Sequence, residues 1–409
     1  MSATSSIPQM STSTEFHSAS AVRPNAPAIL VFRSATLGDF ILACPALRLL
    51  KQTYPDARVV LLTTQSGNRA IRDSVARYSP TSPIPWVELA MPHLIDEVVL
   101  LGGSPTMASL WALRSQLRGY QIKQGVLLLD PAAPWRGRFK KLLLLRFLLG
   151  GVPLLGWRAR GSLSGNKARL KEAGLLPHHV HGSAHFLGEM KPPRSYQERD
   201  IVFDLRLSPQ SDNWVDEWWY SQALSGKTVI AVAPGSIQPH KRWPIARFAE
   251  LCAQLLAEYP AVHIVVIGTP SDTALGAELA SELGPRAISL AGQTSVSQLA
   301  SLLKRCDLLV GNDGGSMHLG DAVGCKVVSI VPGIEYPDSI EPWNNRQFAV
   351  RHSVACAPCY NFLSCPLGHN KCMVDLPLEP VIDNCRRQLA RCGSAERPAL
   401  TASTSRNTQ

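Results

Sequence analysis

The stretch "AILVFRSATLGDFILACPAL" (28–47) begins with an apolar run, continues through a short Ser/Thr/Gly turn and ends in a segment of helical composition. This order predicts a buried β-strand that leads through an exposed turn into a helix. The only acid in the stretch, Asp39, falls where the helix is expected to begin. An aspartate at that place is either a helix N-cap, for which Asp is well suited, or a carboxylate that faces a ligand.

The same order of strand, turn and helix recurs along the chain. Runs rich in Val, Ile and Leu alternate with amphipathic segments, which is typical of parallel sheets covered by helices on both faces. The sequence therefore predicts an α/β fold with two doubly wound parallel-sheet domains. The expected strands are 28–32, 57–64, 96–101 and 124–130 in the first half, and 228–234, 261–268, 287–292, 307–312 and 326–333 in the second. The expected helices are 40–52, 67–77, 244–258, 272–283, 295–305 and 316–323.

The bulk composition is that of a globular protein with an excess of positive charge. A chain of 409 residues with 45% hydrophobic and 18% charged residues is long enough for two cores. The net charge of +10, from 41 Lys and Arg against 31 Asp and Glu, favours an anionic partner. Nucleic acid, a phosphorylated substrate and an acidic membrane surface all fit that charge, and charge alone does not distinguish them.

The ends of the sequence differ from its middle. The first residues are polar and lack an apolar core, so no secretory signal is expected, and no apolar run approaches the length of a membrane span. The ten cysteines are therefore expected to be reduced thiols in a cytoplasmic protein. The predicted division is a disordered arm (1–26), a first domain (27–205), a second domain (206–392) and a disordered tail (393–409).

The segment "VGNDGGSMHLGDAVG" (310–324) carries the features of an anion site. A strand is expected to end at Asn312, two glycines allow close backbone approach, and Ser316 is expected to cap the following helix, whose N-terminus favours anions. Asp313 would repel a phosphate, but it can accept hydrogen bonds from sugar hydroxyls. The pattern suits a ligand with both groups, and the alternative is a tight turn with a capping acid.

A second loop, in "APGSIQPHKRWPIARF" (233–248), places a glycine and a serine after a strand. Lys241 and Arg242 then precede a helix that is expected to begin at Pro244, because proline is favoured in a first turn. Two cations beside a cleft can neutralise a diphosphate leaving group. The alternative is an ordinary solvated Lys-Arg pair.

Three motifs are absent from the sequence. No G-x-G-x-x-G follows the first strand, which argues against a nicotinamide dehydrogenase, and no G-x-x-x-x-G-K-[ST] occurs, which argues against a P-loop NTPase. No D-x-D supplies an obvious carboxylate pair for a divalent metal on a diphosphate. Charge on a leaving group would then be balanced by Lys241, Arg242 and helix dipoles.

Four stretches in this order resemble the ADP-heptose:lipopolysaccharide heptosyltransferase family, glycosyltransferase family 9. They are "ILVFRSATLGDFILACPALRLLKQTYPDARVVLLT" (29–63), "VAPGSIQPHKRWPIARFAEL" (232–251), "LAGQTSVSQLASLLKRCDLLVGNDGGSMHLGDAVG" (290–324) and "CAPCYNFLSCPLGHNKCM" (356–373). The resemblance implies a GT-B fold of two Rossmann-like domains, with the acceptor in the first and the donor in the second. It also implies inverting, metal-independent transfer of heptose from ADP-heptose to the lipopolysaccharide inner core, with no cofactor. The alternatives are another nucleotide sugar, a sugar-nucleotide epimerase on the same fold, and a non-catalytic binding protein.

The resemblance assigns roles to residues. Asp39 would be the general base, Lys241 would contact the donor phosphates and Asp313 the donor sugar. His318 would belong to the diphosphate-binding turn, or would only brace the helix. The other expected donor-binding residues are Gly235, Ser236, Arg242, Gly314, Gly315 and Ser316, and the expected acceptor-binding residues are Thr36 and Gly38. The chain departs from the family pattern in "DGGS", where "DSGP" is common, and in Gly320-Asp321, where Ala-Ala is frequent.

Two clusters resemble metal ligands. Cys356, Cys359, Cys365 and Cys372 fit structural thiols, a zinc or iron–sulfur site, or a disulfide. The histidine-rich segment 178–186 matches an acceptor-side segment of the family, so no metal is expected there.

The Leu-rich segment 137–161 is flanked by Arg and Lys and is too broken to span a membrane. It is either a buried helix with a basic end or a surface that meets anionic lipid and the acidic groups of the acceptor. The expected location is the cytoplasm, with peripheral contact to the cytoplasmic face of a Gram-negative inner membrane. No nucleic-acid partner is expected.

Overall fold

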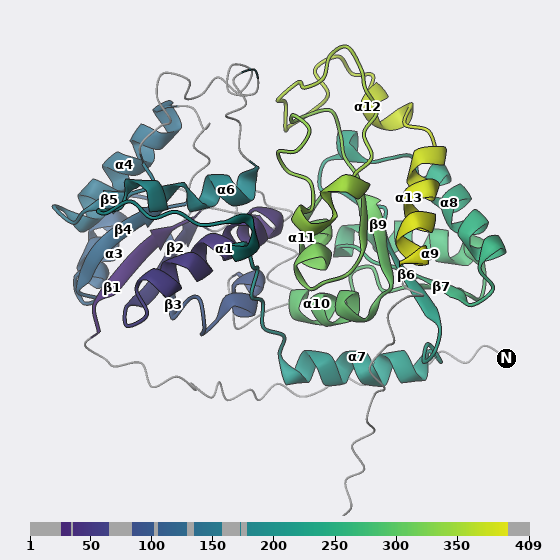
Figure 1. The fold of residues 1–409 in the computed structure, drawn as a ribbon, viewed down its shortest axis with the longest axis horizontal. Coiled ribbons are helices and arrows are strands. Elements are labelled where there is room, and N and C mark those ends of the chain that lie inside the picture. Colours follow the sequence, from purple (N-terminus) through teal and green to yellow (C-terminus); the bar gives the residue numbers. More distant parts are fainter. Residues whose placement is uncertain are drawn as a thin grey trace, which may run out of the picture.

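The computed structural model describes residues 26–33, 36–64, 84–101, 105–128, 135–157, 172 and 178–391. Two five-stranded parallel sheets lie side by side, each flanked by helices (Figure 1). The first has the order β3-β2-β1-β4-β5 and the second β10-β9-β6-β7-β8. This confirms the expected pair of doubly wound domains.

The first half, in purple and blue in Figure 1, follows the predicted alternation of strands and helices. Strand β1 is buried at every position, as expected for a strand covered on both faces, and its pairing with β2 runs from Ala28–Arg58 to Phe32–Leu62. The strands are β1 (Ala28–Phe32), β2 (Arg58–Thr64), β3 (Glu97–Leu101), β4 (Ile122–Leu127) and β5 (Leu154–Leu155). The helices are α1 (Leu37–Thr53), α3 (Met107–Arg118), α4 (Trp135–Leu149) and α6 (His179–Ser183).

The second half repeats the plan. Helix α8 buries Phe248, Leu251, Cys252 and Leu255, a spacing that places one apolar stripe against the sheet. The strands are β6 (Thr228–Ala233), β7 (Val262–Val266), β8 (Ala287–Ser289), β9 (Leu308–Asn312) and β10 (Val327–Ile330). The helices are α7 (Pro209–Ser221), α8 (Ile245–Glu258), α9 (Thr273–Leu283), α10 (Val296–Arg305), α11 (Gly315–Ala322), α12 (Lys371–Val374) and α13 (Glu379–Ala390).

The strand order reverses beside β1 in the first sheet and beside β6 in the second. Ligands of open α/β sheets bind at the carboxyl ends of strands near such a reversal. The turn after β1 and the loops after β6 and β9 are therefore the natural places for a site.

The two halves share part of their interior. One continuous cluster of buried apolar residues includes Val31 and Phe186 from the first half and Leu303 and Met317 from the second. Helices α1 and α11 face each other at the centre of the molecule (Figure 1). The proposed boundary between residues 205 and 206 stays a prediction, although the Arg206 N–H donates to the Leu89 carbonyl of the first half while α7 packs against α10 of the second.

Several expectations lie outside the described residues. These are the helix at 67–77, the tail at 393–409 and nearly all of the arm at 1–26. No helix in the described part of the chain is both long and apolar enough to cross a membrane.

Candidate functional site

The turn after β1 brings Asp39 to the start of α1. Thr36 is the N-cap residue and Asp39 is the third helical residue, so the alternative in which Asp39 is the N-cap does not hold. Its carboxylate accepts a hydrogen bond from the Thr36 hydroxyl at 3.1 Å and lies 3.6 Å from the Arg33 guanidinium. The Asp39 side chain remains 42% exposed. The carboxylate is thus held in place and still open to a ligand.

The surroundings of Asp39 favour its charged form. Burial raises the pKa of Asp39. The positive charge of Arg33, the nearby imidazoles of His179 and His318 and the Thr36 hydrogen bond together lower that pKa by more than burial raises it. The pKa of Asp39 therefore lies below its ordinary value. At neutral pH the group is a carboxylate that can accept a proton.

On the other half, Asn312 joins two loops at the end of β9. Its side-chain oxygen accepts a hydrogen bond from the Trp243 N–H at 2.9 Å, and its amide donates to the Pro234 carbonyl at 2.7 Å. Asn312 is buried. The loop after β6 is thereby fixed against the turn after β9, an arrangement that the sequence analysis did not predict for this residue.

Lys241 and Asp313 meet across these two loops. The Lys241 ammonium lies 3.5 Å from the Asp313 carboxylate, and the two side chains are 15% and 6% exposed. The Lys241 ammonium also lies 5.9 Å from the centre of the Phe362 ring. The two residues that the sequence assigns to donor phosphate and donor sugar are therefore neighbours.

Arg242 turns back onto its own loop. Its guanidinium donates to the Ser236 carbonyl at 2.6 and 2.9 Å and lies 3.7 Å from the buried carboxylate of Asp272. That carboxylate also explains Gly235, because a Cβ there would lie 2.5 Å from it. Arg242 braces the loop in this structure, and its contact with donor phosphate stays a prediction. The part played by Asp272 has no signal in the local sequence.

The starts of α11 and α8 differ from those predicted. Helix α11 begins at Gly315 with Gly314 as its N-cap residue, and no side chain caps it, so the expected cap by Ser316 is wrong. Helix α8 begins at Ile245, with Pro244 one position before it. The Met317 N–H donates to the Gly314 carbonyl, and no N-cap side chain bonds the start of α11, an arrangement that suits an anion there.

Glycines allow the two halves to touch at the site. A Cβ on Gly38 would lie 2.8 Å from Cδ2 of His318, and a Cβ on Gly315 would lie 2.9 Å from the side chain of Leu37. Residues expected to bind acceptor and donor are thus in direct contact where α1 and α11 begin.

His318 is buried and has an unused polar atom. Burial lowers its pKa, and the carboxylates of Asp313 and Asp39 raise it less, so the ring is neutral at pH 7. Its Nδ1 has no hydrogen-bond partner among the described residues. A buried polar atom without a partner is costly, which favours a ligand at this position.

The departure from the family pattern at Gly320-Asp321 has a structural role. Gly320 leaves room for Leu309, whose Cδ2 would lie 2.6 Å from an added Cβ. The Asp321 carboxylate accepts hydrogen bonds from the Asn344 N–H at 3.0 Å and the Asn345 amide at 2.7 Å. Asp321 therefore holds residues 343–348 against α11.

The histidine-rich segment connects the halves. His178 donates from Nε2 to the Glu341 carbonyl at 2.8 Å and accepts at Nδ1 from the Val180 N–H, and burial lowers its pKa to about 3. The His179 N–H donates to the Ser339 carbonyl at 2.9 Å. The rings of His178 and His181 pack against Trp343. The segment is an interdomain contact in which the buried His178 ring is neutral.

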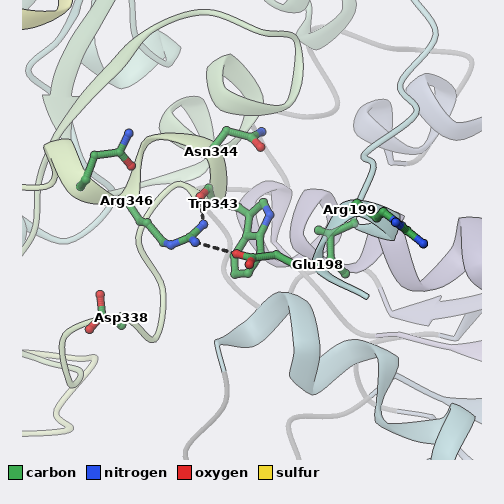
Figure 2. Close-up of a pocket in the computed structure, with 8 residues that line it drawn as sticks. Glu198, Arg199, Asp338, Trp343, Asn344 and Arg346 are labelled. Atoms are coloured by element: carbon green, nitrogen blue, oxygen red, sulfur yellow. Dashed lines mark hydrogen bonds and ion pairs between the residues drawn. The ribbon is translucent and has the colours of Figure 1, made fainter. Parts of the chain in front are cut away.

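Trp343 also lines a pocket of about 780 Å³ between residues 198–201 and 338–347. Figure 2 shows the Arg346 side chain pointing toward Trp343 and Glu198: its guanidinium lies 4.4 Å from the centre of the Trp343 ring and 2.6 Å from the Glu198 carboxylate. The sequence analysis predicted none of these residues as functional.

The four clustered cysteines are free thiols that line one cavity together with His240 and His369. The Cys356 sulfur lies 3.9 Å from Nε2 of His369. Across the described ranges, no group of three or more His, Cys, Asp or Glu side chains is arranged to hold a metal ion. The disulfide alternative is not formed in this structure.

The model of glycosyltransferase family 9 (heptosyltransferase) matches residues 137–367, more than half of the chain. The chain belongs to glycosyltransferase family 9. This confirms the resemblance found in the sequence.

Curated relatives of this family 9 chain have moderate identity. Lipooligosaccharide heptosyltransferase 2 of Campylobacter jejuni (strain 81116) is 30% identical over 169 residues, which cover 40% of this chain and 52% of that protein. The chain therefore matches about half the length of that relative. Lipopolysaccharide heptosyltransferase 2 of Escherichia coli (strain K12) is 25% identical over 333 residues, covering 79% of this chain and 87% of that protein.

Solved structures confirm the GT-B fold. E. coli ADP-heptose lps heptosyltransferase II superposes with a TM-score of 0.62 at 19% identity, covering 90% of this chain and 100% of that one. A glycosyl transferase family 9 protein from Veillonella parvula superposes with a TM-score of 0.65 at 18% identity, covering 89% of this chain and 98% of that one. At these identities the likeness is one of fold.

Proposed function

We propose that this chain transfers heptose from ADP-heptose to the inner core of lipopolysaccharide, with inversion at the anomeric carbon. One observation carries the proposal: Asp39 lies in the first turn of α1, where the neighbouring Gly38 approaches His318 and Gly315 at the start of α11. The proposal therefore brings a base and an anion site together at the meeting point of the two halves. The names of the curated relatives supply the substrate classes.

The proposed step needs one base. The acceptor hydroxyl attacks the anomeric carbon, its proton passes to the Asp39 carboxylate, and the bond from that carbon to the diphosphate oxygen breaks to release ADP. Arg33 and the Thr36 hydroxyl hold the carboxylate, so little reorientation is needed. Thr36 and Gly38 would line the acceptor side, in a domain that spans residues 27–205.

The leaving diphosphate needs positive charge. Lys241 and the N-terminal end of α11, which no side chain caps, would supply it without a divalent metal. When the donor enters, Asp313 would exchange part of its contact with Lys241 for hydrogen bonds from sugar hydroxyls. The unpartnered Nδ1 of His318 offers one more polar contact. Gly235, Ser236, Arg242, Gly314, Gly315 and Ser316 complete the proposed donor site.

We place this reaction in the cytoplasm, at the face of the Gram-negative inner membrane where a lipid-linked acceptor would be met. The net charge of +10 supports peripheral contact with anionic lipid, and we assign no nucleic-acid partner.

The test is an assay of ADP release from ADP-heptose, with and without a truncated core acceptor. We expect release that depends on the acceptor, with a heptosylated product. Isomerisation of the donor without acceptor would instead indicate an epimerase, and donor binding without turnover would indicate a binding protein. A panel of nucleotide sugars in the same assay identifies the donor.

A further inference from the structure

Helices α3 and α4 form a surface of one charge. Together they contain seven cations and no acid, within a chain whose net charge is +10. Such a surface attracts anions at a distance. Four of the seven are exposed: Arg118, Arg136, Lys140 and Arg146. Arg114 and Lys141 are partly buried, and Arg138 is buried.

The exposed face of α4 alternates cations with large apolar side chains. Arg136, Phe139, Lys140, Leu143 and Arg146 are exposed and follow helical spacing on one face, and Phe139 and Leu143 are 50% and 53% exposed. The opposite face buries Leu145 and Leu148 against the sheet. The exposed apolar groups are thus not part of the core.

Helix α3 extends this face. Met107 and Trp111 are 61% and 55% exposed. The Trp111 ring packs edge-on against Phe147 of α4 at 5.1 Å, and the Arg114 guanidinium lies within 6 Å of both ring centres. Helices α3 and α4 lie side by side (Figure 1). The contacts of Trp111 and Arg114 with Phe147 join their aromatic and basic groups.

We propose that the exposed face of α3 and α4 docks on an anionic lipid bilayer, with Trp111, Phe139 and Leu143 entering the interface and the cations contacting headgroups. Charge complementarity selects an anionic partner, because neither helix has an acid. The scattered aliphatic groups select a bilayer over nucleic acid, since they can enter lipid and gain nothing from phosphates in water.

The placement also orients the molecule. Helix α4 follows β4, so its first turn lies at the carboxyl edge of the sheet, the edge that carries the Asp39 turn. The Arg33 guanidinium, next to Asp39, donates to the Leu128 carbonyl at the end of β4. Burial and the charges of Arg33 and Arg138 lower the pKa of Lys141, in keeping with this closeness. A docked bilayer would lie beside the cleft. The value of that orientation for a lipid-linked acceptor rests on the proposed function, whereas the surface itself does not.

The experiment is sedimentation of the full-length chain with vesicles of phosphatidylcholine alone or mixed with phosphatidylglycerol, at low and high salt. We expect binding to the anionic vesicles only, and release by salt. The double variant Phe139→Ser/Leu143→Ser should weaken binding by at least about ten-fold, because the buried apolar area is lost. Arg118→Gln/Lys140→Gln should weaken it by about five-fold for each cation.

Matched controls lie on the second half. Tyr220→Ser/Val374→Ser removes exposed apolar groups, and Lys304→Gln removes an exposed cation, and both should bind as the parent does. Thermal unfolding checks that every variant is folded. Equal binding to neutral and anionic vesicles, no binding to either, or unchanged binding by the Phe139/Leu143 variant would overturn the proposal. Duplex DNA that displaces the vesicles from the parent but not from the Arg118/Lys140 variant would point to a nucleic-acid surface instead.

Activity separates this proposal from the proposed function. With a water-soluble truncated acceptor, all of these variants should keep the parental rate. A parent that binds vesicles but transfers no sugar would disprove the function and leave the docking surface standing.

Discussion

Asp39 is held as a charged carboxylate at the meeting point of two helices. We expect Asp39→Asn to lower the rate of transfer by about 10² to 10⁴-fold while donor affinity changes little, because the amide keeps the shape but cannot accept the proton. Steady-state kinetics with separate donor-binding measurements check this. Near-normal turnover with reduced stability would mean that Asp39 serves only the helix.

The lowered pKa of Asp39 also predicts how the rate of transfer depends on pH. Since the pKa of Asp39 lies below its ordinary value, the base is already deprotonated across pH 5 to 8. Activity should rise with pH only at the acidic pH values near this lowered pKa. Between pH 5 and 8, protonation of Asp39 should therefore cause no loss of activity. A pH–rate profile with an acidic limb near neutrality that disappears in Asp39→Asn would contradict this.

The Lys241 ammonium lies 3.5 Å from the Asp313 carboxylate, and replacing Lys241 tests how leaving-group charge is balanced. We expect Lys241→Met to raise the donor Kd and slow transfer, while Arg247→Met, which removes an exposed cation on α8, has no effect. EDTA should leave the parental rate unchanged. A strict requirement for Mg²⁺ or Mn²⁺ would show that a metal carries this charge.

Single residues differ in how much the local sequence reveals. Asp39, Lys241 and Asp313 could be singled out as candidates because each follows a recognisable strand and turn, and their roles at the site stay predictions. Asn312 was expected only as a strand end, and Asp272 was not predicted at all, because their partners Trp243 and Arg242 are reached through long-range contacts. Side chains that brace a loop carry no pattern until the fold brings their partners together.

The contact between the first turns of α1 and α11 depends on glycine. In Gly38→Ala the new methyl group would lie 2.8 Å from the His318 ring, so the ring or the helix must shift. We expect a large fall in kcat with a small change in melting temperature, since the displaced ring lies at the site and not in a sheet. Gly188→Ala, where no atom lies within 4 Å of the added Cβ, is the matched control. Equal effects from both variants would mean that the close approach is unimportant.

The join between α11 and residues 343–348 should depend on pH. Burial raises the pKa of Asp321 from 3.8 to about 6, against the effect of its hydrogen bonds from Asn344 and Asn345. The native state therefore keeps a proton that the unfolded chain has lost, and the free energy of unfolding falls as pH rises from about 4 to about 6. The size of this fall is about 3 kcal/mol.

Urea unfolding from pH 4 to 7.5 measures this fall in the free energy of unfolding. Asn at position 321 cannot titrate, so this part of the pH dependence should be absent in Asp321→Asn. The difference in the free energy of unfolding between parent and variant should therefore change between about pH 4 and 6 and stay constant above that range. A difference that stays constant with pH would show that Asp321 titrates normally.

Elements were more predictable than their ends. The burial pattern of β1 and β9 and the apolar stripe of α8 follow directly from composition, and the structure has them within a few residues of the predicted bounds. The two helices predicted to begin at residues 316 and 244 begin at Gly315 and Ile245. These starts were missed because capping depends on backbone angles that composition does not determine. Helices α3, α7 and α13 were not predicted.

At the scale of the whole molecule, the sequence predicted two domains of the same type, and the structure has them with the same strand order. What it could not predict is how they meet. The contacts of His178 with Glu341 and of Gly38 with His318 join residues more than a hundred positions apart, and no periodicity records such a pairing.

The buried cluster that runs from one half into the other has a consequence for how the protein melts. Because Phe186 and Met317 belong to the same interior, neither half can lose its packing without exposing apolar surface of the other. Heating should therefore give one calorimetric peak, with a calorimetric enthalpy equal to the van't Hoff enthalpy, although the chain has two sheets. Two resolved peaks would mean that the shared interior is too weak to couple the halves.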